Sequence, residues 1–209
     1  MERSDFWHNS CSFKFTMPRG PRHLPEAGMF HLIARGNNGV CICRNREDFS
    51  HLKRTILRFT PNTEVAVHHY ALMHTHFHLL AWVEDTNVLA SVMKALLVSY
   101  QLYYRRKYPY NGHLWHSRFR SILMKDEAQW LQCARYIELN PVYAGICQDP
   151  KEYRWTSYHH YTFGKSDSFI RTKLHLSGMN TWKQFVLAGI DLDYQKLKRE
   201  LEQERFLKK

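Results

Sequence analysis

Two histidines separated by a single residue, His76 and His78, interrupt the apolar run Ala71–Trp82. In a β-strand, successive side chains point to opposite faces, so these two imidazoles would share one face. Imidazole is a ligand for divalent metals such as zinc, manganese, iron and nickel. Two ligands do not complete a site, so a third protein donor is required. In a chain with 14 histidines, a pair of partly buried structural histidines is the alternative.

A tyrosine and an asparagine four residues apart, Tyr136 and Asn140, lie further along the chain. On a helix, residues at this spacing are neighbours on one face. A phenol is a potential nucleophile, and a third ligand on the same face could complete a site with the histidine pair. Asparagine before Pro141 is also a common helix stop, so the interpretation rests on the two pairs occurring together.

The 209 residues are enough for one domain with a real core. A formal charge of +11 and 14% aromatic residues favour a nucleic-acid partner over a merely solvated basic surface, because cations neutralise phosphates and rings stack on bases. The five cysteines have neither zinc-knuckle spacing nor the density of a disulfide framework, which indicates reduced thiols. We find neither an apolar run of about 18 residues nor a signal-peptide core, so we expect a cytoplasmic protein.

The order of the elements follows from the spacing of apolar residues. We expect a flexible basic arm over 1–28, a domain over 29–163 and a helical tail over 164–209. Alternation predicts strands over 29–35, 65–72, 76–83 and 118–124, with a hairpin turn near 73–75. Helical spacing predicts helices over 46–60, 87–107 and 126–140, a short helix within 150–163, and one or two helices within 181–208.

The helix that carries the tyrosine has an apolar stripe that includes Ala134 and Ile137. At 100° per residue, Tyr136 lies off this stripe, which favours a functional ring over a core ring. Pro141 is expected to end the helix before a second tyrosine, Tyr143.

Rings and cations alternate at the end of the 87–107 helix, in the stretch Tyr103–Pro109. Cations that complement the helix dipole would explain the basic residues but not the density of tyrosines, so we favour a DNA-facing end. The candidates for contacts with the DNA backbone are Arg105, Arg106, Lys107, Arg118, Arg120 and Arg154.

Five motifs occur in a fixed order: Arg35-Gly36-Asn37, Met73–Leu80, Gly112–Phe119, Arg135–Val142 and Tyr153–Tyr158. With them, the chain resembles the single-tyrosine HUH transposases over about residues 17–160, and within that group the REP-associated tyrosine transposases. The resemblance implies an α+β fold in which helices pack on a ferredoxin-like or RRM-like antiparallel sheet. It also implies action on single-stranded DNA at palindromic hairpins.

By the same resemblance, His76 and His78 are metal ligands, Asn140 completes the site and Tyr136 is the nucleophile. Magnesium or manganese is the expected ion. The expected reaction is cleavage and rejoining of DNA through a covalent 5′-phosphotyrosine, in a bacterial, nucleoid-associated protein. The alternatives are an inactive hairpin-binding protein of the same fold and a metal-dependent nuclease without a covalent step. The active form could be a monomer or a homodimer.

The chain departs from the family pattern in two places. His74-Thr75 stands where the family usually has Pro-Asn, so His74 is a possible extra ligand. Tyr143 stands where the family often has arginine, which makes it a second candidate nucleophile.

Overall fold

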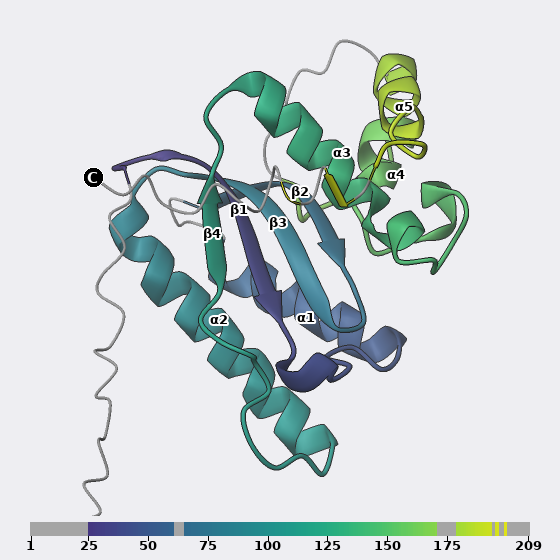
Figure 1. Cartoon of the computed structure of the whole chain (residues 1–209). Coiled ribbons are helices and arrows are strands. Elements are labelled where there is room, and N and C mark those ends of the chain that lie inside the picture. Colours follow the sequence, from purple (N-terminus) through teal and green to yellow (C-terminus); the bar gives the residue numbers. More distant parts are fainter. Residues whose placement is uncertain (1–24, 61–64, 171–178, 194, 197–198, 200–209) are drawn as a thin grey trace, which may run out of the picture.

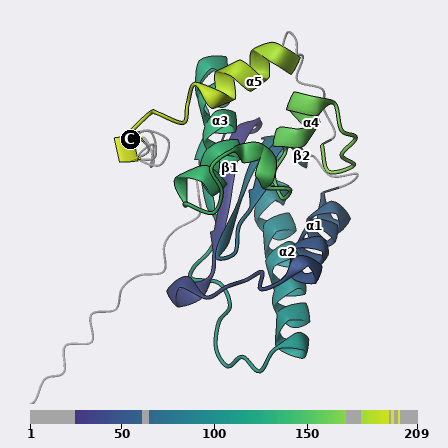
Figure 2. The same ribbon diagram turned by 90° about the vertical axis from the view of Figure 1, so that its right-hand side faces the viewer.

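Four antiparallel strands form a sheet with helices on both faces in this computed structural model (Figures 1 and 2). The structure describes residues 25–60, 65–170, 179–193, 195–196 and 199 of the chain. Among these residues, no helix combines the length and the apolar character needed to cross a membrane.

The sheet contains β1 (Gly28–Arg35), β2 (Val65–Leu72), β3 (His76–Val83) and β4 (Arg120–Leu123) in the order β2-β3-β1-β4. Helix α1 (Arg46–Phe59) connects β1 to β2, and α2 (Thr86–Lys107) connects β3 to β4. This βαββαβ order with antiparallel neighbours is the ferredoxin-like arrangement, so the predicted α+β fold is confirmed. The predicted hairpin turn at 73–75 is also present.

Helices α1 and α2 cover one face of the sheet (Figures 1 and 2). Alternation along β1 sends Phe30, Leu32 and Ala34 to this face, where they pack in the larger core. Helix α1 begins at a capping box, in which the Asn45 side chain accepts from the Asp48 N–H and the Asp48 side chain accepts from the Asn45 N–H.

Helix α3 (Glu127–Tyr143) lies on the opposite face, α5 (Met179–Leu187) contacts α3, and α4 (Tyr158–Phe163) packs against α5 (Figure 1). The prediction that Tyr136 lies off the core was wrong, because its side chain is only 1% exposed. Helix α3 is buried on more than one side, since the sheet covers one side and α5 approaches another. A single apolar stripe therefore does not describe its core positions.

The prediction that Pro141 ends this helix was also wrong, since α3 continues to Tyr143. Proline removes one N–H from the helix, but the next turn keeps its bonds. The Ala144 N–H donates to the Asn140 carbonyl at 2.9 Å, and the Tyr143 hydroxyl donates to the Gly189 carbonyl at 2.7 Å. This contact with Gly189, the second residue after α5, holds the last turn of α3 in place.

The segments at the two predicted domain boundaries make contacts with the domain. The Thr86 N–H donates to the Glu26 carbonyl, so the chain just before β1 is joined to the start of α2. Beyond residue 163, Phe169 is buried in the larger core, and Asp167 pairs with Lys53 at 2.8 Å. Packing therefore does not stop at residue 163. Most of the predicted arm (1–24) and most of the predicted last helix (197–198 and 200–209) lie outside the described residues.

Two short 3-10 turns complete the elements, η1 (Asn37–Gly39) and η2 (Pro150–Glu152). The first follows Gly36, where a Cβ atom would lie 2.4 Å from the Val40 carbonyl oxygen. Only glycine fits such a close backbone approach. The Gly36 N–H donates to the Thr75 carbonyl at 2.7 Å, which fixes the end of β1 against the β2–β3 turn.

Candidate active site

The histidine pair lies at the beginning of β3, on the face of the sheet that α3 covers. His76 and His78 have ring centroids 4.9 Å apart, and their cross-strand neighbours on β1 are Arg35 and Ile33. His78 is 3% exposed, whereas His76 is partly exposed at the edge of the site. The pair thus joins a buried ring to a more accessible one.

His74 does not join this pair. It lies in the turn before β3, where its Nδ1 is 2.8 Å from the Cys43 carbonyl oxygen. Its ring meets the edge of Phe49 of α1, with centroids 5.1 Å apart. These contacts give no support to an extra ligand at this position, because they join His74 to the segment before α1 and to α1 itself.

A third imidazole, that of His31 on β1, contacts His78 and was missed by the sequence analysis. His31 Nε2 lies 2.8 Å from His78 Nδ1, and the two ring planes are 27° apart with centroids 5.0 Å apart. The side chain of His31 is fully buried. One signal was present, since a histidine stands within the apolar strand, but its relation to β3 depends on a strand register that the sequence does not give.

Tyr136 lies against the imidazoles of His31 and His78. Its ring is edge-on to His31 and to His78, with centroids 6.0 and 5.8 Å apart. Asn140 follows one turn later on α3 and is 3% exposed. Its side-chain amide donates to the Tyr136 carbonyl at 2.9 Å. The structure thus brings the predicted tyrosine to one of the two predicted histidine ligands, with the asparagine on the next turn of the same helix.

The donor set suits a divalent cation. The described part of the chain contains no cluster of three or more His, Cys, Asp or Glu side chains that could hold a metal. A third protein ligand beside the two imidazoles would therefore be of another type, and the amide oxygen of Asn140 is one that magnesium and manganese accept. The His31 contact at His78 Nδ1 is the kind of support that a metal-ligating histidine usually has.

The electrostatic environment keeps the deepest ring neutral. Burial, with smaller contributions from the charges of Arg120 and His76, lowers the pKa of His31 from 6.5 to about 3. At neutral pH, His31 is therefore an uncharged ring with one N–H and one lone pair.

Two arginines flank the site on the same face of the sheet. Arg120 of β4 stands across from Ile33, which itself stands across from His78. Arg35 stands across from His76 and is exposed. Directly opposed residues in an antiparallel pair project to the same side, so both guanidinium groups belong to the face that carries the histidines. Arg35 was not among the predicted contacts, because its position depends on the same strand register.

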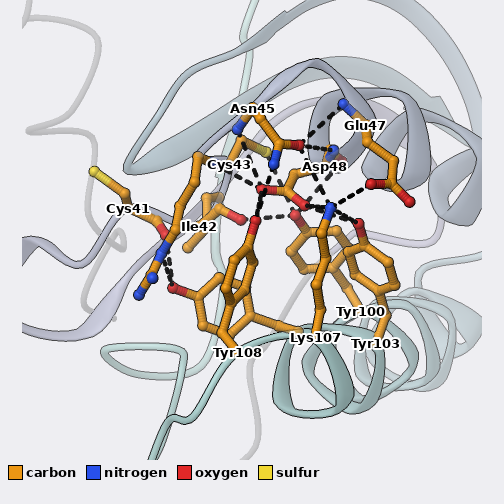
Figure 3. A network of polar contacts seen from close by, with 12 residues as sticks. Cys41, Ile42, Cys43, Asn45, Glu47, Asp48, Tyr100, Tyr103, Lys107 and Tyr108 are labelled. Carbon is orange, nitrogen blue, oxygen red and sulfur yellow. Dashed lines mark hydrogen bonds and ion pairs between the residues drawn. The ribbon is translucent and has the colours of Figure 1, made fainter.

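The predicted DNA-contacting cations differ in their surroundings. Arg106 and Arg118 are exposed, and Arg105, also exposed, donates to the Gly112 carbonyl at 2.9 Å. Arg154 is exposed and lies over the Trp155 ring. Lys107 is different, because its ammonium lies 2.8 Å from Asp48 and 2.6 Å from Glu47 (Figure 3). Its charge is compensated within the fold.

A buried carboxylate holds α3 from its other side. Glu138 is fully buried and lies 2.9 Å from the Nδ1 atom of His69 on β2. It also accepts from the Ser157 hydroxyl at 2.7 Å and from the Trp182 indole N–H at 3.0 Å. Since these partners come from β2, the segment before α4, and α5, one side chain joins all of them to the helix that carries Tyr136.

The arrangement defines a class: an α+β protein of the ferredoxin-like kind in which a tyrosine-bearing helix lies against histidines on the sheet. The sequence pattern of a known family, described as "Transposase IS200 like", matches residues 27–140, which is more than half of the chain. The chain belongs to this family.

Two solved structures are similar to the chain. A REP-associated tyrosine transposase, solved bound to a REP hairpin, has a TM-score of 0.60 at 12% identity and covers 76% of this chain and 99% of its own. A candidate transposase from Deinococcus radiodurans has a TM-score of 0.41 at 20% identity and covers 58% of this chain and 96% of its own. The first of these shares the fold. Among curated proteins, no similar sequence was found.

Proposed function

We propose that this protein cleaves and rejoins single-stranded DNA at hairpin elements through a covalent 5′-phosphotyrosine on Tyr136. The observation that carries the proposal is the contact of the Tyr136 ring with His78, at 5.8 Å between centroids. Membership of a transposase family supports DNA as the substrate. Hairpin DNA as the proposed substrate is supported by the fold that the chain shares with a REP-associated transposase, which was solved bound to a REP hairpin.

In the proposed mechanism, His76, His78 and Asn140 would hold a magnesium or manganese ion. When bound, such an ion draws negative charge from the scissile phosphate. The Tyr136 oxygen attacks phosphorus and forms a new P–O bond, while the bond to the 3′ oxygen breaks. The phenol loses its proton, and the leaving oxygen gains one to become a 3′-hydroxyl. One phosphodiester replaces another, so rejoining needs no further energy source.

Attack also requires a conformational step. Tyr136 is 1% exposed, so its oxygen reaches a DNA strand only after the ring turns outward or α3 moves away from the sheet. Such steps commonly set the rate of enzymes that close around their substrates. We therefore expect adduct formation to be slower than DNA binding.

Exposed and partly exposed arginines are proposed to hold the DNA backbone. Arg35 and Arg120 flank the histidines and are proposed to contact phosphates near the scissile bond. Contacts of this kind position a strand without reading its sequence. The remaining candidates are proposed to contact the backbone further from the site: Arg105, Arg106, Arg118 and Arg154.

The proposal is tested by incubating the protein with end-labelled single-stranded hairpin DNA and Mn²⁺ and separating covalent adducts on a denaturing gel. The wild-type protein should form an adduct that protease treatment removes. Tyr136→Phe should abolish the adduct and retain hairpin binding, because only the nucleophilic oxygen is removed. Tyr143→Phe is the matched control and should keep the adduct, since the Tyr143 hydroxyl donates to the Gly189 carbonyl at 2.7 Å.

Other outcomes would replace the proposal with a different one. An adduct that survives Tyr136→Phe and is lost in Tyr143→Phe would move the nucleophile to Tyr143. Cleavage without any adduct would indicate a hydrolytic nuclease. Binding of hairpins without cleavage under any divalent metal would indicate an inactive hairpin-binding protein.

A further inference from the structure

His31 is a buried polar residue in contact with His78 and Tyr136 that has no role in the proposed mechanism. It is fully buried on β1, and its Nε2 atom lies 2.8 Å from Nδ1 of His78. Its other ring nitrogen, Nδ1, has no hydrogen-bond partner among the described residues. A buried polar atom without a partner is costly, so an apolar residue would be favoured here if the position served only the core.

We propose that His31 is a positioning residue that fixes the ring orientation and the tautomer of His78 for metal binding. This inference rests on the proposed function, in which His78 is a ligand. A ligating histidine needs a lone pair on the coordinating nitrogen, and its second nitrogen then carries the proton. With His78 Nδ1 in contact with His31, coordination falls to Nε2, and the Nδ1–H of His78 donates to Nε2 of His31.

The orientation of the two rings supports the same role. Their planes are 27° apart and their centroids 5.0 Å apart, so the rings meet edge to edge as an N–H···N hydrogen bond requires, and this bond restricts rotation of His78 about its Cβ–Cγ bond. The ring of Tyr136 packs against both imidazoles in an edge-on arrangement. His31 therefore touches the proposed ligand and the proposed nucleophile at once. Removing its ring would loosen both.

His31 is placed as a support and not as a ligand. No group of three histidine, cysteine or acidic side chains suited to a metal occurs within the described ranges, so the three histidines do not surround one point. The contact at 2.8 Å is that of a hydrogen bond. Supports of this kind typically change metal affinity by about 10- to 100-fold when they are removed.

The test measures Mn²⁺ affinity without DNA, from the EPR signal of free Mn²⁺ during titration. His31→Phe keeps a planar ring but removes the acceptor, and it should weaken Mn²⁺ binding by about 10- to 100-fold. His31→Gln, whose amide oxygen can accept from His78, should restore most of the affinity. His68→Phe is the matched control: it also removes a buried imidazole, on β2, and should leave the affinity unchanged.

The outcomes separate this inference from the proposed function. If His78→Ala abolishes Mn²⁺ binding while His31→Phe binds Mn²⁺ as tightly as the wild type, the inference is overturned and the metal site stands. If neither His76→Ala nor His78→Ala changes Mn²⁺ affinity, the proposed metal site itself fails.

A measurement on the wild-type protein covers the case in which His31→Phe does not fold. Nitrogen-15 NMR of the histidine side chains with Zn²⁺, a diamagnetic probe, should show His78 protonated at Nδ1 and bound through Nε2. Binding through Nδ1 would be incompatible with the His31 contact and would overturn the inference.

Discussion

On the face of the sheet that α1 and α2 cover, β1 contributes Phe30 and Leu32, whereas on the face that α3 covers the same strand contributes His31. Strand β3 repeats the contrast, with Phe77 on the first face and His78 on the second. Alternation along two strands thus places only apolar side chains on the first face, whereas on the second face it places two buried imidazoles next to the apolar side chains of a smaller core. Both faces stabilise the fold, and the second also carries groups that can do chemistry.

Two buried polar groups, one beside each face, differ in how completely they are hydrogen-bonded. Buried Asp48 lies in the first turn of α1, close to the end of α2. It accepts hydrogen bonds from Lys107, Tyr103 and Tyr108, each at 2.8 Å (Figure 3). Every partner is a donor, so this carboxylate is fully satisfied. Beside α3, the Nδ1 atom of His31 has no partner within the described ranges. A satisfied network stabilises a fold, whereas an unsatisfied buried group marks a site with another purpose.

The largest expected effect comes from breaking the Asp48 network. Asp48→Ala should lower the free energy of unfolding by about 3 kcal/mol, because it leaves Lys107 and two tyrosines without their common acceptor. Urea unfolding measures the change. The exposed partner provides the control: Glu47 is 68% exposed in its pair with Lys107, so Glu47→Ala should cost less than about 1 kcal/mol.

The same variant tests whether the two faces are independent. Well below its unfolding temperature, Asp48→Ala should bind Mn²⁺ like the wild type, since Asp48 lies on the α1–α2 side of the sheet. Equal costs for Asp48→Ala and Glu47→Ala would contradict the central place of Asp48. Loss of Mn²⁺ binding would show that the faces are coupled.

Acid should weaken the α1–α2 side through the same carboxylate. Burial by itself raises the pKa of Asp48, but hydrogen bonds from Lys107, Tyr103 and Tyr108 outweigh it and lower the pKa to about 2 from an ordinary value of 3.8. A pKa that is lower in the folded state gives stability above pH 3.8, which is lost as the pH falls toward 2. This difference corresponds to about 2 kcal/mol.

The measurement compares the wild-type protein with Asp48→Asn by urea unfolding between pH 5 and pH 2. The wild type should lose about 2 kcal/mol more than the variant over this range. A background loss remains in both proteins, because the pKa of Asp167 is also lowered: burial raises it, and bonds from Lys53 and Tyr70 outweigh burial. If the free energy of unfolding falls with pH equally in both proteins, the folded state does not stabilise the anionic form of Asp48.

The sequence predicted one of these faces better than the other. Strand alternation and helical spacing were enough for the sheet, for α1 and α2, and for the hairpin that presents His76 and His78. They failed for α3, because burial on several sides hides the periodicity on which the placement of Tyr136 depended. His31 was missed for a different reason: its contact with His78 follows from pairing between β1 and β3, and register is a property of the folded sheet.

The smallest expected effect comes from comparing Arg118, a proposed DNA-binding cation, with Lys107, a cation that stabilises the fold. Arg118 is exposed two residues after His116, whose N–H donates to the Arg35 carbonyl beside the site. Arg118→Ala should reduce the slope of log K against log salt for hairpin binding by about 1 and leave urea unfolding unchanged. Lys107→Met should leave the salt slope unchanged and lower the free energy of unfolding, because the Lys107 ammonium already pairs with Asp48 and Glu47. If Lys107→Met reduces the salt slope as much as Arg118→Ala does, the end of α2 contacts DNA after all, and the α1–α2 side serves binding as well as stability.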